Sequence, residues 1–293
     1  MNKLDLAGRT VAITGSTGGL GSALADALRG RKANLVLLDL DHDAVTAQAE
    51  RLGGERVAVG LRADVGDMQR LEDAMRRAVE HFGRLDIVIA GAGSAEGLTT
   101  LELIDPRDWE QTIDINLNGV WRTFRAALPS VQAQRGHLLA ISSMAAFVHN
   151  PLNGPYPASK AGVWAMCDTF RLELRHQGVT VGSVHPTLFK TPMVDAVSAN
   201  PAALRLMNNF KGFWRLAPVE TVVDDTIRGI ERRSAHVITP RSLWPVALAP
   251  GLLGPLIARL GFRGNAIEDA TTLATRAAAT DQPSGSRTGE PSA

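Results

Sequence analysis

Short apolar runs alternate with longer amphipathic stretches along most of the chain. Seven runs rich in Val, Ile and Leu stand between stretches with the mixed apolar and polar pattern of surface helices. Strands that alternate with helices of about ten residues or more form right-handed βαβ units and a parallel sheet. The pattern predicts an α/β fold with a doubly wound, seven-stranded parallel sheet and helices on both faces. The predicted strands are residues 10–14, 34–39, 57–63, 87–90, 137–142, 179–185 and 236–239.

The domain organisation follows from where this pattern stops. No linker or change of composition divides residues 1–241, so one domain is expected there. Within it, residues 190–216 have little strand character and form an excursion beyond the sixth strand, which is a candidate substrate lid. Residues 242–275 form an apolar C-terminal extension. Residues 276–293 are rich in Ser, Thr, Gly and Pro and are expected to be disordered.

The extension contains a very apolar stretch, residues 243–262, in which Arg259 is the only charge. Its length would allow a membrane span of about 20 residues. However, Pro245, Pro250 and Pro255 recur every five positions and break a continuous helix. Packing over a substrate pocket is therefore the leading interpretation, and peripheral contact with a membrane or with a second subunit stays open as the alternative.

Composition narrows the choice of partners. The 31 basic and 30 acidic residues are spread without long runs, so bulk charge does not favour nucleic acid. Cys167 is the only cysteine and is expected to be a small buried residue, and the seven histidines have no spacing typical of a metal site. The first nine residues do not resemble a signal peptide, so the expected location is the cytoplasm.

A glycine-rich turn follows the first predicted strand and leads directly into a helical run, residues 22–29. Glycines allow the backbone to turn tightly and to come close to a pyrophosphate, and the amides at the start of the next helix point at that negative charge. The turn therefore predicts a dinucleotide site of the Rossmann type, with a plain tight connection as the alternative. The expected contacts are Gly15, Ser16, Thr17, Gly19, Leu20 and Gly21.

The ends of the next strands extend this site. Asp39 ends the second strand, where a carboxylate can accept hydrogen bonds from the adenosine ribose and would repel a 2′-phosphate. No Arg or Lys stands in the glycine turn to hold such a phosphate, so NAD is preferred over NADP. The alternative role for Asp39 is that of a helix cap. Further contacts expected at the adenine and at the second ribose are Asp64, Val65, Ala90, Gly91 and Ala92.

The only tyrosine of the chain, Tyr156, lies four positions before Lys160. On a helix this spacing places both side chains on one face, so the ammonium can lower the pKa of the phenol. A phenol tuned in this way can exchange protons near neutral pH. A packed tyrosine and a solvated lysine would explain the spacing equally well if it stood alone, but its neighbours favour the catalytic interpretation.

Taken in order, these positions resemble the short-chain dehydrogenase/reductase family. The family's members are NAD(P)-dependent oxidoreductases of the Rossmann fold, and the resemblance implies that activity here, on CH–OH groups. It covers about residues 6–239 and rests on Thr14-Gly15-x-x-x-Gly19-x-Gly21, Asp64, Asn116, Ser143, Tyr156, Lys160 and residues 186–191.

The resemblance implies roles for four catalytic positions. Tyr156 would be the acid and base that exchanges a proton with the substrate oxygen, and Lys160 would stabilise its phenolate. Ser143 would hold the substrate oxygen by a hydrogen bond. Asn116 would support a water that relays protons to Lys160. Ser142 is the rival of Ser143, but only Ser143 has the family's spacing to the tyrosine.

The stretch 186–191 resembles the family's loop beside the nicotinamide, which implies cofactor contacts from Pro186, the backbone of Leu188, and Thr191. The chain departs from the family pattern at two places. Thr187 stands where glycine is usual, which would alter the geometry of this loop. Ala90-Gly91 replaces the usual Asn-Asn, which removes an asparagine that ties neighbouring strands together. Neither change touches the four catalytic positions.

The substrate wall consists of residues that the family does not fix. Residues 145–149 and 151–155 would form one side, and apolar residues of the lid would form the other. A pocket lined in this way suits a hydrophobic secondary alcohol or ketone, such as a steroid or a lipid. The expected substrate contacts are Ser143, Ala145, His149, Tyr156 and Phe213, and the alternative for His149 is solvent exposure.

The resemblance also implies a homodimer or homotetramer. A different class of function is a non-catalytic NAD-binding or membrane-associated protein on the same fold. The complete set of four catalytic residue types favours the enzyme, because a protein that only bound the cofactor would not need all of them.

Overall fold

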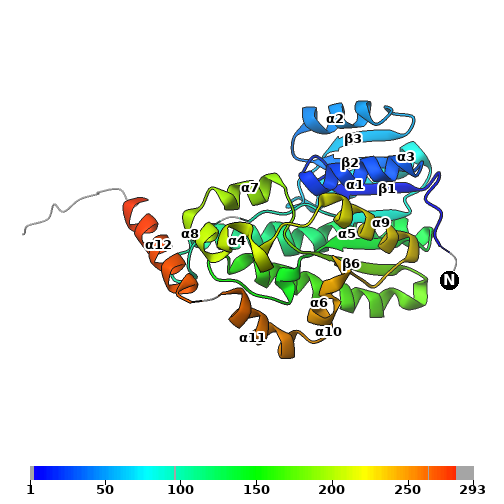
Figure 1. Ribbon diagram of the computed structural model, residues 1–293. Coiled ribbons are helices and arrows are strands. Elements are labelled where there is room, and N and C mark those ends of the chain that lie inside the picture. The colour runs from blue at the N-terminus through cyan, green and yellow to red at the C-terminus, as the bar shows by residue number, and fades with distance from the viewer. Residues whose placement is uncertain (1–2, 96, 263, 282–293) are drawn as a thin grey trace, which may run out of the picture.

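Seven apolar segments form one parallel sheet in the order β3-β2-β1-β4-β5-β6-β7 (Figure 1). The computed structural model describes residues 3–95, 97–262 and 264–281, without the side chains of Ala196, Phe213 and Asp281. The predicted doubly wound sheet is confirmed, and the strand ends differ from the prediction by one residue at β3, β5 and β6. The strands are β1 (Thr10–Thr14), β2 (Asn34–Asp39), β3 (Ala58–Arg62), β4 (Ile87–Ala90), β5 (His137–Ile141), β6 (Thr180–Pro186) and β7 (His236–Thr239).

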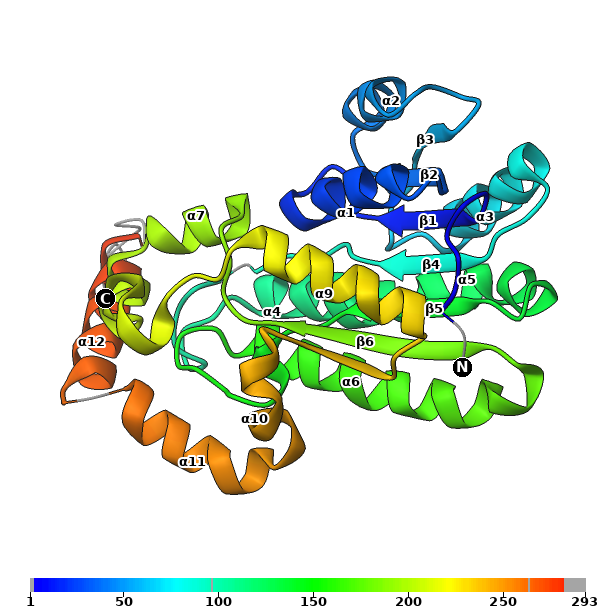
Figure 2. The same cartoon turned by 45° about the vertical axis from the view of Figure 1, so that its right-hand side comes forward.

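Helices cover both faces because the strands are apolar on both sides. Along β1, Val11 and Ile13 lie on one face and Ala12 on the other. The face of Val11 packs against α1 (Gly19–Gly30), α2 (His42–Arg51) and α9 (Val219–Arg232). The face of Ala12 packs against α3 (Met68–Phe82), α5 (Gly119–Ala133) and α6 (Pro155–Leu174). Figure 2 shows α9 and α6 on opposite sides of β6.

Several short elements lie outside these two layers. Helix α4 (Pro106–Ile113) begins at Asp105, whose carboxylate accepts a hydrogen bond from the Arg107 amide at 2.8 Å, and it continues into the π-helical turn η1 (Asp114–Asn118). The remaining turns of the main domain are η2 (Met144–Ala146), η3 (Arg175–Gln177) and η6 (Arg241–Leu243).

The segment expected to be a lid is helical. It contains α7 (Pro192–Ser198), α8 (Pro201–Leu206) and the short turns η4 (Asn208–Phe210) and η5 (Gly212–Trp214). Its two ends meet, because Phe189 and Ala217 form a parallel bridge and the Ala217 amide donates to the Leu188 carbonyl at 2.8 Å. The lid is therefore an excursion that leaves and rejoins the domain at one place.

The C-terminal extension packs on this lid. It comprises α10 (Trp244–Leu248), α11 (Pro250–Gly261) and α12 (Ala266–Asp281), and Figure 1 shows α12 beside the lid helix α8. Ala270 of α12 is buried in a cluster with Leu206 of α8. The guanidinium of Arg205 lies 2.6 Å from the carboxylate of Asp269, and the indole of Trp214 donates to the Gly261 carbonyl at 3.0 Å. The extension therefore braces the lid.

The end of α12 corrects one expectation. Residues 276–281 were expected to be disordered, but they are helical. The alanines at 277–279 are strong helix formers and continue the helix, whereas the composition of the whole tail is dominated by the residues after them. Residues 282–293 lie outside the described residues, so the disorder expected there stays a prediction.

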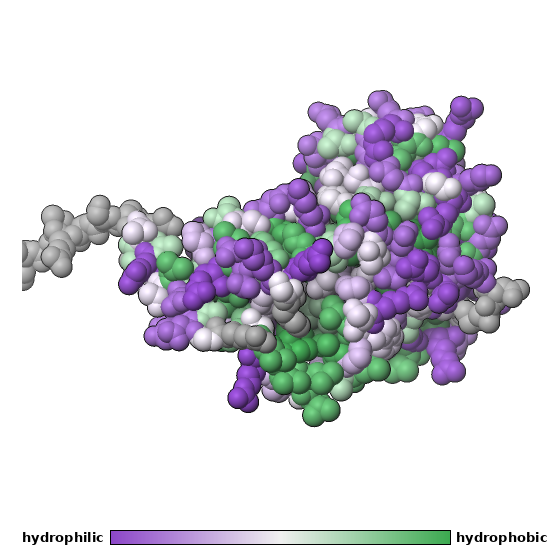
Figure 3. Space-filling view, in the orientation of Figure 1, coloured by the Kyte–Doolittle hydropathy of each residue, from purple (hydrophilic) through white to green (hydrophobic). Residues whose placement is uncertain are grey.

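The extension also presents an apolar surface. Leu252, Leu256 and Leu260 of α11 are 77%, 51% and 45% exposed, and Figure 3 shows hydrophobic residues gathered over this part of the molecule. Among the described residues no single helix is long and apolar enough to cross a membrane. Only the pair Arg241–Leu248 and Pro250–Gly261 passes on length and composition, and it is bent by 117°.

We expect Ala270→Asp to detach α12 from the lid, because it places a carboxylate without a partner in the apolar cluster with Leu206. The substitution should cost about 3 kcal/mol of local stability. The matched control is Ala277→Asp, an exposed position of the same helix, with an expected effect within about 0.5 kcal/mol. Limited proteolysis of α12 and a thermal melt measure both effects, and equal protection in the two variants would contradict the bracing contact.

Candidate active site

A cavity of about 1050 Å³ lies where the strands end, between the sheet, the lid and the extension. The strand order reverses between β1 and β4, and open α/β sheets bind ligands in the crevice at such a point. Most of the expected cofactor contacts line this cavity. These are Gly15, Thr17, Gly19, Leu20, Gly21, Asp39, Asp64, Val65, Gly91, Ala92, Tyr156, Lys160, Pro186, Leu188 and Thr191.

Two expected cofactor contacts do not line the cavity. Ser16 is fully buried, with its backbone amide donating to the Leu38 carbonyl and its carbonyl accepting from the side-chain amide of Gln48 at 2.7 Å. Ala90 is the last residue of β4 and is 1% exposed within the core. Both are near the site in sequence, but their side chains belong to the interior of the fold.

The glycine turn has the close backbone approach that a dinucleotide site needs. Gly15 has a φ of +69°, and a Cβ on it would lie 2.8 Å from Ala92 Cα. A Cβ on Gly21 would lie 2.1 Å from the Gly15 carbonyl oxygen, so neither position accepts a side chain. The same residues leave the start of α1 open to the cavity, where its amides can meet an anion. This cradle fits the pyrophosphate of a dinucleotide.

The chain lacks the asparagine that usually ties these neighbouring strands together, and the side chain of a threonine connects them instead. The Thr14 hydroxyl accepts hydrogen bonds from the amides of Gly91 and Ala92 at 3.1 and 3.4 Å. The end of β1 thereby holds the chain after β4 in place. The second departure, Thr187, lines the cavity, and its amide donates to the Thr239 carbonyl at 2.9 Å.

The carboxylate of Asp39 organises the other end of the glycine turn. One of its oxygens accepts from the Thr17 amide at 2.9 Å and from the Thr17 hydroxyl at 2.6 Å. Asp41, and not Asp39, caps α2. Among the described lining residues, Lys160 and Arg215 are the only lysine and arginine, and neither lies in the glycine turn or at the end of β2. The end of the cavity beside the glycine turn and β2 is therefore acidic.

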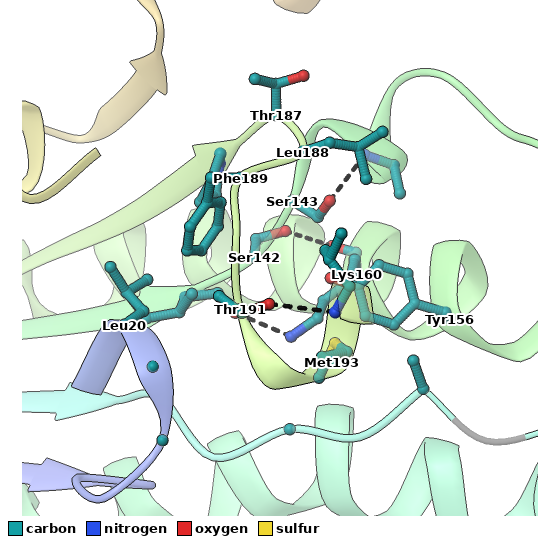
Figure 4. A pocket seen from close by; sticks show the side chains of 18 of the residues that line it. Leu20, Ser142, Ser143, Tyr156, Lys160, Thr187, Leu188, Phe189, Thr191 and Met193 are labelled. Atoms are coloured by element: carbon teal, nitrogen blue, oxygen red, sulfur yellow. Dashed lines mark hydrogen bonds between the residues drawn. The ribbon is translucent and has the colours of Figure 1, made fainter. Parts of the chain in front are cut away.

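Helix α6 brings Tyr156 and Lys160 to the wall of the cavity, next to Ser143 (Figure 4). The Lys160 ammonium nitrogen lies 5.5 Å from the centre of the Tyr156 ring and donates to the Ile141 carbonyl at 3.0 Å. Ser143 begins the turn η2, and its hydroxyl oxygen accepts from the Ala145 amide at 3.1 Å. Three of the four expected catalytic side chains thus share one wall.

Ser142 and Ser143 have different surroundings. The Ser142 hydroxyl donates to the Lys160 carbonyl at 2.9 Å, so it ties the end of β5 to α6. A hydrogen bond from the Ser143 side chain opposes the rise in the pKa of the Tyr156 phenol that burial causes. The geometry therefore favours Ser143 as the residue that meets a substrate oxygen.

Burial acts on both members of the tyrosine–lysine pair. It raises the pKa of the Tyr156 phenol above its ordinary value, and it lowers the pKa of Lys160 to about 8. The sequence spacing predicts a lowered phenol pKa. In the protein without a ligand, however, burial removes water from the phenolate and from the ammonium, and this cost outweighs the attraction between the two charges. The phenol is therefore neutral at pH 7, and Lys160 loses its proton close to neutrality because its pKa is about 8.

Asn116 lies behind the wall and not in the cavity. It lies in the π-helical turn η1, which connects α4 to α5, and its side chain is fully buried. Its side chain accepts from the Ser94 amide and donates to the Ser94 carbonyl, both at 2.8 Å. A Cβ on Gly93 would lie 3.1 Å from Asn116 Oδ1 and 3.6 Å from the Lys160 nitrogen. Asn116 therefore positions the segment after β4 close to Lys160, and its water relay stays a prediction.

The substrate end differs in part from the expectation. Ala145 lines the cavity, whereas the side chain of His149 is exposed and does not, although its neighbours Val148 and Asn150 do. The side chain of Phe213 lies outside the described part of the structure. Asn153 lines the cavity within the wall expected at residues 151–155, and Leu243, Val246 and Ile257 line it from the extension, whereas Asn150 is a lining residue that the sequence did not predict. The extension thus packs over the pocket, as its proline spacing favoured.

Comparison with known proteins agrees with this geometry. A model of the short chain dehydrogenase family matches residues 9–202. The chain belongs to the short-chain dehydrogenase family. It is therefore an oxidoreductase by family, and its Rossmann-type sheet is the fold of that family.

Two relatives and one solved structure illustrate the likeness. A (-)-trans-carveol dehydrogenase of Rhodococcus erythropolis is 37% identical over 204 residues, 64% of this chain and 73% of the relative. A trans-4-hydroxycyclohexanecarboxylate dehydrogenase of Sinomonas cyclohexanicum is 34% identical over 196 residues, 64% and 75% of the two chains. The crystal structure of a family member from Burkholderia phymatum in complex with NAD has a TM-score of 0.75 at 24% identity, covering 86% of this chain and 96% of that one.

We expect the stability of the NAD-free protein to rise between pH 7.5 and 9.5 because of Lys160. The pKa of Lys160 is about 8 in the folded state and 10.5 without the fold, so in this window the unfolded chain binds more protons. The free energy of unfolding of the wild type should rise by about 2 kcal/mol relative to Lys160→Met, which carries no titrating group. Urea unfolding of both proteins across this range measures the difference. If the free energies of unfolding of the two proteins changed in parallel with pH, the Lys160 ammonium would be hydrated in the folded state and the prediction would be wrong.

Proposed function

We propose that this member of the family is an NAD-dependent oxidoreductase that interconverts a hydrophobic secondary alcohol and its ketone. The observation that carries the proposal is the position of Ser143, Tyr156 and Lys160 on one wall, between a glycine cradle and an apolar end of the same cavity. The two relatives are named as dehydrogenases of carveol and of trans-4-hydroxycyclohexanecarboxylate, which supports a secondary alcohol as the substrate class.

The residues of the cavity fit NAD, and different residues would bind the different parts of the cofactor. The amides of the glycine turn suit the pyrophosphate, and Asp39 suits the hydroxyls of the adenosine ribose. At the other end, the Thr191 hydroxyl accepts from the Val194 amide at 3.2 Å and keeps its proton for a ligand. Bound NAD would supply the hydride acceptor for oxidation and, as NADH, the hydride donor for reduction.

The chain's own residues handle the proton and the substrate oxygen. In reduction, the Tyr156 phenol donates its proton to the carbonyl oxygen, and in oxidation the phenolate accepts the proton of the hydroxyl. The nearby Lys160 ammonium favours the phenolate electrostatically. The Ser143 hydroxyl donates a hydrogen bond to the same substrate oxygen and so stabilises the negative charge that develops there.

We expect Tyr156→Phe to lower kcat by at least about a hundredfold, because it removes the only phenol that can transfer the proton. NADH binding should change by less than about threefold, since the ring and its packing remain. Absorbance at 340 nm with a panel of cyclic and long-chain secondary alcohols measures the first effect, and NADH fluorescence measures the second. If wild type and variant were equally inactive across the panel while both bound NADH, the non-catalytic alternative would replace the enzyme.

We expect the wild type to bind NADH about tenfold or more tightly than NADPH, because a 2′-phosphate would meet the carboxylate of Asp39, and the described residues that line this end of the cavity include no Lys or Arg. Asp39→Asn keeps the shape, removes the charge and should bring the two dissociation constants closer together. Thr17→Val is the control, because it removes only one hydrogen bond to Asp39 and leaves its charge. An unchanged ratio in Asp39→Asn would show that the carboxylate does not select the cofactor.

Three statements about the surroundings of the enzyme stay predictions from the sequence. They are location in the cytoplasm, assembly as a homodimer or homotetramer, and a peripheral contact with a membrane through residues 243–262. The exposed leucines of α11 are the surface that such a contact would use.

A further inference from the structure

One polar side chain at the substrate end of the cavity has a hydrogen-bonding atom that is unpaired within the described part of the structure. Asn153 is 9% exposed and lines the cavity, and its Oδ1 has no hydrogen-bond partner among the described residues. Buried polar atoms are nearly always paired, and an unpaired carbonyl oxygen destabilises the protein. The other asparagine of this loop differs, because the Asn150 amide donates to the Pro151 carbonyl at 3.2 Å. The unpaired Asn153 therefore points to a ligand group.

The backbone beside Asn153 is held in an uncommon conformation. Leu152 has a φ of +67°, a left-handed conformation that costs free energy for any residue except glycine. Its side chain is buried among Leu206 of α8, Phe262 and Ala270 of α12. Such conformations persist where packing determines them, and they occur often at ligand sites. The braced lid and extension thus set the position of Asn153, two residues before α6 begins at Pro155 and brings in Tyr156.

The other lining residues from the lid and the extension are mainly apolar, among them Val194, Met207 and Ile257. In a pocket of this kind a few polar groups fix the orientation of a ligand, while the apolar wall supplies most of the contact. An amide both accepts and donates hydrogen bonds, as does a hydroxyl group. A hydroxyl would therefore pair the amide of Asn153 more completely than an ether or a hydrocarbon would.

We propose that the side-chain amide of Asn153 binds a second hydroxyl group of the substrate, away from the carbon that is oxidised. The preferred substrate is then an apolar skeleton with two oxygen functions, one at Tyr156 and one at Asn153. This proposal rests on the proposed alcohol dehydrogenase function, but the role of Asn153 in binding is testable without turnover.

The test measures ligand binding to the Tyr156→Phe protein saturated with NAD, by isothermal titration calorimetry. The probes are cyclohexanol and the cis and trans isomers of 1,3- and 1,4-cyclohexanediol. We expect at least one diol to bind about tenfold more tightly than cyclohexanol. Adding Asn153→Leu, which keeps the branched shape and removes the amide, should abolish this preference and leave cyclohexanol binding within about threefold. Asn150→Leu is the matched control and should keep the preference.

The possible outcomes test the role of Asn153 and the proposed reaction separately. If no diol binds more tightly than cyclohexanol, or if Asn153→Leu keeps the diol preference, the role of Asn153 is overturned, whatever the activity of the enzyme. NADH binding checks that the Asn153→Leu protein is folded, and Asn153→Ala replaces it if it is not. In proteins with Tyr156 intact, the same preference should appear in kcat/KM, whereas loss of all turnover with the preference retained would overturn only the proposed reaction.

Discussion

The close approach of two strand ends is the constraint on which the site depends. At the carboxyl ends of β1 and β4, Gly15 lies so near Ala92 that no side chain fits between them, and the Thr14 hydroxyl holds the amides of the same segment. This contact lies at the point where the strand order of the sheet reverses. The glycine turn adjoins this contact on one side, and the segment that Asn116 holds through Ser94 adjoins it on the other. The cofactor end of the cavity is therefore a product of the backbone more than of particular side chains.

The substrate end has a different physical origin. It is assembled by packing between helices that are far apart in the chain, with α8 and α12 enclosing the left-handed Leu152. The ion pair between Arg205 and Asp269 lies at the surface and contributes little, so the buried cluster is the main support. The lid leaves and returns at the bridge between Phe189 and Ala217. Movement of the lid would therefore carry α12 with it, unless their common cluster separates.

The fold and the cofactor end could be predicted because their signals are local. Apolar runs specify strands, and the spacing of Gly15, Gly19 and Gly21 specifies a turn whose geometry hardly depends on the rest of the chain. Effects of burial could not be predicted in this way. The spacing of Tyr156 and Lys160 indicates an attraction between them, but the direction of the phenol's pKa depends on how much water the fold removes. The same holds for Ser16 and His149, since sequence proximity to a site does not say whether a side chain faces it.

The two ends of the cavity are built from different parts of the chain, so a substitution in one part can leave the other end unchanged. The match to the family ends at residue 202, whereas Trp214, Leu243, Val246 and Ile257 line the cavity from beyond that point. Substitutions in this later part of the chain alter the walls around a substrate and leave the cradle for the cofactor and the tyrosine–lysine pair as they are. One set of catalytic residues can in this way be inherited intact while the choice of substrate changes, and exchange of the C-terminal segment between relatives is a direct route to a new specificity.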